Sequence, residues 1–285
     1  MKMIALFPKV DREEALTAAR QVISFLKQRG IRIVIEEEKA HLFDDPPLTS
    51  VDPSAIDLLI TLGGDGTILR VGRRYAHLNV AILGINLGNL GFMADVHISD
   101  LHVCLQDIID GKFSVRNRLM LEGTYPDGTS FFAINDCVLH RAYNPGLIEI
   151  TVYIDDAYLN TFKADGLILS TPTGSTAYSL AAGGPILTPD LEAFVLSPVC
   201  PHTISHRPLV ISSRRTIRFE ALSKQSPIEV VNDGSVGFEM QNGETMTLKK
   251  SGQTFKLACL KRINFFSILR EKLGLSGKLH SSRVT

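Results

Sequence analysis

Short apolar runs alternate with amphipathic stretches through the first hundred or so residues of the chain. The apolar runs at residues 3–7, 31–35, 56–60 and 79–85 have the length of buried strands. Residues 13–29 place apolar side chains at helical spacing and end at Gly30, a residue type common after helix C-termini, and residues 98–110 predict a further helix. Strands that alternate with helices in this way indicate a parallel, doubly wound, Rossmann-like α/β sheet.

The pattern changes at about residue 118, where short β-rich segments follow one another with turn residues between them. The predicted strands cover residues 119–125, 131–140, 148–154, 158–163, 209–220, 228–231, 245–249 and 255–260. Short strands at regular spacing are typical of an all-β, sandwich-like domain. Residues 264–273 predict a final amphipathic helix. We therefore expect an α/β domain over residues 1–117, a β-rich domain over 118–262, and a C-terminal segment, 263–285, that returns to the first domain.

Composition narrows the possible classes of function. Lysine plus arginine equals aspartate plus glutamate, at 30 each in 285 residues, so no global positive field favours nucleic acid as a partner. The four cysteines are far apart and form no C-x-x-C, which argues against a zinc ribbon or a disulfide framework and suits a reducing cytosol. No run of about 18 apolar residues exists to span a membrane. We expect a cytoplasmic protein that binds neither nucleic acid nor membrane.

The segment Thr-Leu-Gly-Gly-Asp-Gly-Thr, residues 61–67, lies between a predicted strand and a stretch that can form a helix. Glycines let the backbone approach a ligand closely, and the start of a helix offers unpaired N–H groups to a phosphate. A carboxylate at Asp65 would repel phosphate, so we expect it to meet a ribose hydroxyl or a metal ion. The alternative is a plain glycine turn with Asp65 as the N-cap of the helix.

A second glycine-rich segment, residues 86–92, follows the next predicted strand. By itself it is typical of a flexible loop between a strand and a helix. Neighbouring strands of a doubly wound sheet, however, deliver their loops to one crevice at the carboxyl edge. We therefore expect the two glycine-rich segments to lie at the same site.

Residues 165–178 combine hydroxyl side chains with glycine inside the β-rich half of the chain. They predict either a turn-rich surface loop or the start of a helix, with Ser175 or Thr176 at its N-cap, whose N–H groups face a ligand. Asn135 and Asp136 form a polar pair within an apolar strand, which indicates a bulge or a turn-facing pair. Lys163 is either placed to neutralise a phosphate or is an exposed strand lysine.

These segments resemble the motifs of one enzyme family. The Gly63–Thr67 turn resembles the signature shared by NAD kinases, diacylglycerol and sphingosine kinases and 6-phosphofructokinases. The stretch from Asp165 to Tyr178 is similar to the segment that sets NAD kinases apart from the lipid and sugar kinases, and the chain is therefore identified as a member of the bacterial-type NAD kinases.

The resemblance implies transfer of the terminal phosphoryl group of ATP, or of polyphosphate, to the 2′-hydroxyl of the adenosine ribose of NAD. It implies Mg²⁺ carried by ATP with no protein ligand identified, and a homodimer or homotetramer built through the β domain. Asp65 would be the catalytic residue. The residues implied to bind the nucleotides are Gly64, Asp65, Gly66, Thr67, Leu69, Asn86, Gly88, Phe92, Asn135, Asp136, Lys163, Asp165, Thr173, Thr176, Ala177 and Tyr178.

Asp136 departs from the family pattern, which has a glutamate at this position. A carboxylate that is one methylene shorter needs a closer approach or a bridging water to reach a ribose hydroxyl. Two other functions stay open at this point: a lipid or sugar kinase that uses the same glycine turn, and a non-catalytic sensor of NAD or NADP.

Overall fold

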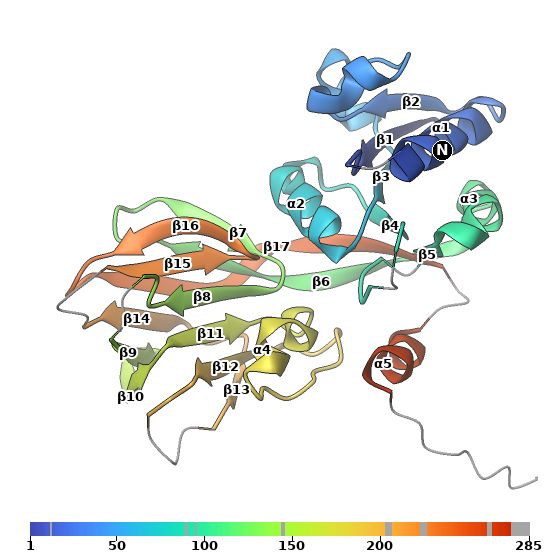
Figure 1. Cartoon of the computed structure of the whole chain (residues 1–285). Helices are drawn as coiled ribbons and strands as arrows, with labels where there is room; N and C mark the ends of the chain where they lie inside the picture. The colour runs from blue at the N-terminus through green and yellow to red at the C-terminus, as the bar shows by residue number, and fades with distance from the viewer. Residues whose placement is uncertain are drawn as a thin grey trace, which may run out of the picture. The chain divides into compact units, whose positions relative to one another are not determined.

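The computed structural model describes residues 1–11, 13–88, 91–94, 96–143, 146–202, 207–222, 227–260 and 264–274 (Figure 1). Positions 89 and 90 of the second glycine-rich segment and residues 275–285 of the C-terminal segment lie outside these ranges. The chain divides into two compact units. The first unit contains Met1–Val71, Leu78–Arg116 and the chain from Lys256 on, and the second unit contains Gly72–His77 and Asn117–Phe255. The domain boundary predicted at residues 117 and 118 stays a prediction.

The first unit is built on a parallel sheet. Its strands are β1 (Met3–Pro8), β2 (Arg32–Ile35), β3 (Leu58–Leu62), β4 (Ile82–Asn86) and β5 (Val96–His97). They lie in the order β2-β1-β3-β4-β5, and every pairing is parallel. Every residue of β1, β3 and β4 is buried. Strands covered on both faces need a continuous apolar sequence, which explains why these runs do not alternate.

Helices accompany these strands. They are α1 (Glu13–Lys27), α2 (Asp65–Arg74), α3 (Leu101–Ile109) and α5 (Phe265–Leu273), with short 3₁₀ turns at Glu37–Leu42, Leu48–Ser50, Pro53–Ala55, Ala76–Leu78 and Ile98–Asp100. The apolar residues that predicted the first helix form the buried face of α1. Gly30 follows that helix with a φ of 75°, a conformation that glycine adopts at little cost. The predicted α/β class of the first unit is confirmed.

The second unit contains two layers of mostly antiparallel strands. One layer is a sheet in the order β13 (Leu209–Ser212), β12 (Ala193–Val199), β11 (Gly166–Ser170), β8 (Asp136–His140), β15 (Ile228–Asn232) and β16 (Ser235–Met240). The other contains β10 (Ala157–Ala164), β9 (Ile148–Ile154), β14 (Ile217–Ala221) and β7 (Ser130–Ala133), together with the parts of β17 (Thr245–Leu260) and β6 (Phe113–Thr124) that belong to the second unit. Buried side chains of both layers, such as Leu167, Phe194 and Phe219, form one apolar core. The predicted sandwich-like class is confirmed.

Three details of the predicted strands were wrong. The strand expected over residues 131–140 is interrupted between β7 and β8, the one over 209–220 is two strands, and the last two predicted strands are the single strand β17. The strands β5, β11, β12 and β16 had no counterpart in the prediction. None of the helices in the described ranges combines the length and the apolar character that crossing a membrane requires.

Candidate functional site

Asp65 is the first residue of α2, and its carboxylate is held by a loop that follows β4 in the chain. Oδ2 accepts a hydrogen bond from the backbone N–H of Phe92 at 2.7 Å, and Oδ1 accepts from the N–H groups of Met93 at 3.1 Å and Ala94 at 2.9 Å. The alternative of an N-cap side chain serving its own helix is wrong, because these bonds go to another segment. Two carboxylate oxygens offer about four acceptor positions. Oδ2 therefore keeps an acceptor position for one further donor.

Gly91 makes this arrangement possible. A Cβ atom on Gly91 would lie 1.9 Å from Oδ1 of Asp65, closer than any non-bonded contact allows. The backbone of the loop can therefore approach the carboxylate only because residue 91 has no side chain. Gly91 lies within the second glycine-rich segment of the sequence, so the structure brings both segments to one place, as expected.

A cavity of about 290 Å³ lies at the carboxyl edge of the parallel sheet in the first unit. Its lining includes Lys9, Asp11, Glu14, Gly64, Asn86 and Gly88. In the order β2-β1-β3-β4 the chain leaves β1 in one direction to reach β2 and then returns to the other side to form β3. Such a switch point between β1 and β3 is where open α/β sheets bind ligands.

The other predicted residues of the first unit lie near this edge in different roles. Asn86 is buried, and its Oδ1 accepts a hydrogen bond from the N–H of Gly88 at 2.9 Å. Gly66 is exposed at the start of α2, whereas Thr67 and Leu69 are buried. Leu69 therefore contributes packing beneath the turn.

Phe92 contacts the last described helix. Its ring centroid lies 6.4 Å from that of Phe265 in α5, and the Lys272 ammonium lies 5.2 Å from the Phe92 centroid. The same residue donates its N–H to Asp65. Phe92 thus connects the Asp65 carboxylate to α5 within the first unit.

In the second unit, β7 and β8 are separated by a loop whose backbone is held by hydrogen bonds from other segments. The Asp233 carboxylate accepts hydrogen bonds from the N–H groups of Ile134 at 2.9 Å, Asn135 at 2.7 Å and Asp136 at 3.2 Å. On the carbonyl side, the Thr171 N–H donates to Asn135 O at 2.8 Å and the Thr171 hydroxyl donates to Ile134 O at 2.6 Å. The backbone at Asn135 is therefore fixed from both sides.

This loop brings Asn135 to the hydroxyl-rich segment. A Cβ atom on Gly174 would lie 2.2 Å from the carbonyl oxygen of Asn135, so the two backbones touch there. One side-chain oxygen in each of these two segments is buried and has no hydrogen-bond partner among the described residues. The two atoms are Asn135 Oδ1 in the loop and Thr173 Oγ1 in the hydroxyl-rich segment. Buried polar atoms in folded proteins are nearly always paired. The two atoms are candidate hydrogen-bond partners for a ligand.

Asp136 lies beside Asn135 and is buried. Burial, followed by the negative charge of Asp233, raises the pKa of the Asp136 carboxyl from 3.8 to about 7. Burial also raises the pKa of Asp233, although its three N–H bonds and the Arg73 guanidinium, with Nε at 3.8 Å, act in the opposite direction. Two buried carboxyl groups with raised pKa values beside a glycine-hydroxyl segment are typical of a functional site.

The segment from residue 171 to 178 is a 3₁₀ turn, Gly174–Thr176, followed by the short helix α4 (Tyr178–Ala181). The prediction that Ser175 or Thr176 caps a helix is wrong. Ser175 instead donates its hydroxyl to Pro172 O at 2.7 Å and accepts from the Leu187 N–H at 3.0 Å, because it is fully buried. Ala177 and Tyr178 are exposed, and Thr176 donates to Thr173 O at 3.2 Å.

The two remaining predicted residues carry ion pairs. Asp165 Oδ1 lies 2.9 Å from Arg141 Nε, with both side chains about one-third exposed. Lys163 Nζ lies 3.3 Å from Glu149 Oε1 across the β9–β10 pair, and its side chain is exposed. The structure therefore does not bring Lys163 to the Asn135 loop.

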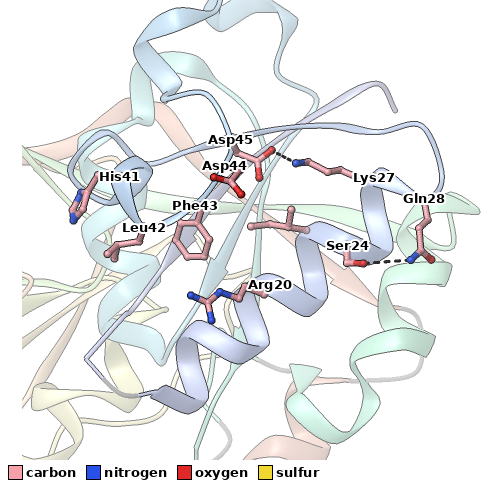
Figure 2. A pocket seen from close by; sticks show the side chains of 10 residues that line it. Arg20, Ser24, Lys27, Gln28, His41, Leu42, Phe43, Asp44 and Asp45 are labelled. Carbon is pink, nitrogen blue, oxygen red and sulfur yellow. Dashed lines mark hydrogen bonds and ion pairs between the residues drawn. The ribbon is translucent and has the colours of Figure 1, made fainter.

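A larger cavity of about 530 Å³ lies between α1 and residues 41–45 in the first unit (Figure 2). Arg20, Lys27, His41 and Asp45 lie around it, and Figure 2 shows the ion pair of Lys27 with the buried Asp45, at 2.7 Å. It contains no residue of the predicted site and no glycine turn. We therefore place one candidate site at the switch point of the first unit and another at the Asn135 loop of the second unit.

The set of site residues predicted from the sequence leaves out four residues that build these two places: Lys9 and Gly91 in the first unit, and Thr171 and Asp233 in the second. The position of Lys9 directly after the first strand was a usable signal. Asp233 was hidden by its neighbours, because Asn-Asp-Gly is a common hairpin sequence and Asp233 does lie in the turn between β15 and β16. No group of three or more His, Cys, Asp or Glu side chains in the described ranges is arranged to hold a metal ion.

Comparison with known proteins identifies similar proteins over nearly the whole chain, and they are NAD kinases. Residues 4–113 match the family model of the ATP-NAD kinase N-terminal domain, and residues 134–260 match that of the ATP-NAD kinase C-terminal domain. An NAD kinase of Protochlamydia amoebophila is 48% identical over 277 residues, which cover 97% of this chain and 99% of the relative. An NAD kinase of Syntrophotalea carbinolica is 37% identical over 281 residues, covering 96% and 99%.

A solved structure of a similar kinase has the same fold. Yeast NADH kinase complexed with NADH superimposes with a TM-score of 0.84 at 26% identity, covering 100% of this chain and 90% of the other. A lipid or sugar kinase is not favoured by these comparisons.

Proposed function

The chain belongs to the NAD kinase family and is an enzyme of that family. We propose that its residues act as follows in the transfer of the terminal phosphoryl group of ATP to the 2′-hydroxyl of the adenosine ribose of NAD. Asp65 accepts a hydrogen bond from that hydroxyl and takes its proton. The observation that carries this role is the fixed carboxylate, with three backbone N–H bonds and one acceptor position left on Oδ2.

The proton moves late in this reaction. An alcohol is a much weaker acid than a carboxylic acid, so transfer to Asp65 becomes favourable only as the new O–P bond forms. Most of the acceleration then comes from holding the reacting oxygen in line with the phosphorus and from neutralising phosphate charge. The Asp65 carboxylate is anchored by three N–H groups and does not need to reorient, so it can hold the reacting oxygen in position.

We propose that ATP carries a divalent cation, Mg²⁺, and that carboxylates at the switch point are suitable ligands for it. Magnesium in nucleotide sites is held mainly by phosphates and water, with one or two carboxylates. Asp11 and Glu14 line the cavity beside Gly64 and would hold the ion. When bound, it neutralises charge on the transferring phosphoryl group.

The Asn135 loop is proposed to bind NAD. The unpaired Asn135 Oδ1 and Thr173 Oγ1 atoms support hydrogen bonds to the nucleotide, and the exposed Tyr178 ring supports contact with a base or a nicotinamide. Asp136 is one methylene shorter than the residue expected for the family, and we propose that its contact with a ribose goes through water.

We propose a cytoplasmic location for this reaction, supported by four cysteines that are all free thiols in the structure.

The test of the catalytic role is a coupled assay for NADP formation from NAD, ATP and Mg²⁺, run beside Asp65→Asn. We expect kcat to fall by a factor on the order of 10²–10⁴ while NAD binding is largely kept. Unimpaired turnover would remove Asp65 from the role. Binding of NAD without turnover in the parent protein would favour the sensor function.

The same assay extends to other substrates. NADH is tested as acceptor because the similar yeast structure is an NADH kinase, polyphosphate is tested as donor, and diacylglycerol is tested as a lipid acceptor.

A further inference from the structure

Arg73 lies near the end of α2 and belongs to the second unit, where its guanidinium bonds to a hairpin turn. The turn joins β15 to β16, and its two central residues, Asp233 and Gly234, have φ values of 46° and 78°, as two-residue hairpin turns require. Arg73 Nη1 donates to Asn232 O at 2.6 Å, and Nη2 donates to Ser235 Oγ at 2.9 Å. The guanidinium therefore holds the turn on both sides of Asp233.

Asp233 is the residue through which this turn holds the Asn135 loop. Its carboxylate accepts hydrogen bonds from the N–H groups of residues 134, 135 and 136, and its own N–H donates to Asp136 O at 3.0 Å. Four hydrogen bonds thus join one residue of the turn to three consecutive residues of the loop. A displacement of the turn would therefore displace the loop.

The Asp233 carboxylate also needs a cation. Its side chain is fully buried, and burying a carboxylate is costly unless the charge is paired. Arg73 Nε lies 3.8 Å from Asp233 Oδ2, too far for a hydrogen bond but close enough for an ion pair. Burial raises the pKa of Asp233, whereas the three N–H bonds and the Arg73 charge oppose that rise. Arg73 therefore favours the ionised carboxylate, the form in which both oxygens only accept.

We propose that Arg73 is a positioning residue for the NAD acceptor: it keeps the turn at residues 232–235 and the Asp233 carboxylate against the Asn135 loop, and so holds Asn135 in the geometry that binds NAD. Arg73 acts here through Asp233. The inference deepens the proposed function, because it rests on the Asn135 loop binding NAD. It adds to the acceptor site a residue outside the predicted set.

Amide hydrogen exchange of the full chain, measured by NMR, tests the positioning without any nucleotide. The N–H groups of Ile134, Asn135 and Asp136 are bonded to Asp233 and should exchange slowly in the parent. Arg73→Met removes the charge and both bonds to the turn, so these three amides should exchange about tenfold faster or more. Amides of β14 should exchange as in the parent. A variant that was only less stable would exchange faster in both places.

Kinetics of the same variant test the consequence for the acceptor. In the coupled assay, Arg73→Met should raise the KM for NAD about tenfold and leave the KM for ATP within about twofold of the parent. Calorimetry with NAD alone should show the same loss of affinity. A variant that only lost stability would have a lower apparent kcat, because fewer molecules are folded, and an unchanged KM for NAD.

Ile217→Val is the control for lost stability. Ile217 is fully buried in β14, which pairs with β9 and β17 and not with the Asn135 loop. Removing one buried methyl group lowers the free energy of unfolding. The KM for NAD of this variant should stay within about twofold of the parent.

Two variants test the charge. Arg74→Met is the matched control, because Arg74 is the next residue of α2 but its guanidinium lies over the Tyr75 ring, 5.4 Å from the centroid. Its KM for NAD should stay within about twofold of the parent. Arg73→Lys keeps the cation but not the forked pair of bonds, so its KM for NAD should lie between those of the parent and Arg73→Met. No recovery in Arg73→Lys relative to Arg73→Met would contradict the part assigned to charge.

A double-variant cycle tests whether Arg73 acts through Asp233. Asp233→Asn keeps the size of the side chain but replaces one accepting oxygen with an NH₂ group, so it should raise the KM for NAD as Arg73→Met does. Adding Arg73→Met to Asp233→Asn should change the KM by less than about twofold, since both changes break the same link. Full additivity of the two effects would show that Arg73 acts elsewhere and would overturn the proposal.

Failure of the inference and failure of the proposed function give different results. Unchanged exchange of the three loop amides in Arg73→Met overturns the inference even when the parent forms NADP. Faster exchange with an unchanged KM for NAD also overturns it. Faster exchange in a chain that neither forms NADP nor binds NAD sustains the link from Arg73 to the loop and rejects the proposed function.

Discussion

Asp136 and Asp233 are two buried carboxyl groups in the same part of the second unit. The free energy needed to bury a charge is large unless the charge is paired. Asp233 has three N–H bonds and Arg73 nearby, whereas Asp136 has no hydrogen bond to its carboxylate from the described residues. The pKa of Asp136 is accordingly raised to about 7, so the folded protein binds this proton more strongly than the unfolded chain does.

This difference predicts a pH dependence of stability. The stabilisation from the bound proton is present below pH 4 and is lost as the pH rises through about 7, where Asp136 ionises in the folded state. One such proton lowers the free energy of unfolding by at most about 1.4 kcal/mol per pH unit across that window. Asp136→Asn lacks this titration. Its stability relative to the parent should therefore rise from pH 5 to pH 8, as measured by urea unfolding.

Asp127→Asn is the control for this experiment. Asp127 is fully exposed, and hydrogen bonds from Thr129 lower its pKa, so its titration ends below pH 5. Its stability relative to the parent should be constant between pH 5 and pH 8. Equal pH slopes for Asp136→Asn and the parent would contradict the role assigned to Asp136.

At the scale of elements, the loop after β4 is what makes Asp65 a fixed group. The loop supplies all three N–H donors, and it can do so only because Gly91 has no side chain. A helix start alone would leave the carboxylate of its first residue free to rotate. The catalytic geometry is therefore a property of two elements together.

Gly91→Ala tests this arrangement while leaving Asp65 in place. The added Cβ would lie 1.9 Å from Asp65 Oδ1, so the carboxylate or the loop must shift. A shift of about 1 Å at a reacting group costs on the order of 10²-fold in rate. We expect kcat in the coupled assay to fall by about that factor.

Gly252→Ala serves as the comparison for Gly91→Ala. A Cβ at Gly252 meets no atom within 4 Å, and the residue is exposed in β17. Activity within about twofold of the parent is expected there. If Gly91→Ala also kept full activity, the fixed position of the Asp65 carboxylate would not matter for turnover.

At the scale of the whole molecule, assembly stays a prediction. The strand β13 comes first in the order of the six-stranded sheet, and its Leu209 and Val210 side chains are 40% and 48% exposed. An exposed apolar edge strand favours association with another chain. This supports the predicted homodimer or homotetramer built through the β domain.

Light scattering of the purified protein tests the assembly. We expect a mass of two or four times that of one chain, and we expect a Leu209→Lys, Val210→Lys double variant to shift the mass toward a single chain. Charged side chains at an edge strand oppose pairing. A parent protein with the mass of one chain would reject the prediction.

Much of the fold followed from local pattern. The buried strands β1, β3 and β4 appear as apolar runs because both of their faces are covered, and α1 appears as a stripe at helical spacing. The glycine turn at residues 63–66 was visible because glycine and a following helix have a local signature. Strand breaks were less visible, since β8 begins only where the Asn135 loop is held by distant groups.

The sequence by itself determined the two classes of fold, the glycine turn and the family resemblance, because each depends on residues close together in the chain. Only the tertiary structure decided which donors hold Asp65, which carboxylate fixes the Asn135 loop, and which lysine lies at the switch point. Asp65 and its donors are 27 to 29 positions apart, and Asp233 is 97 to 99 positions from the loop that it holds. Hydrogen bonds and burial depend on distance in space, and at such separations the folded sheets bring the partners together.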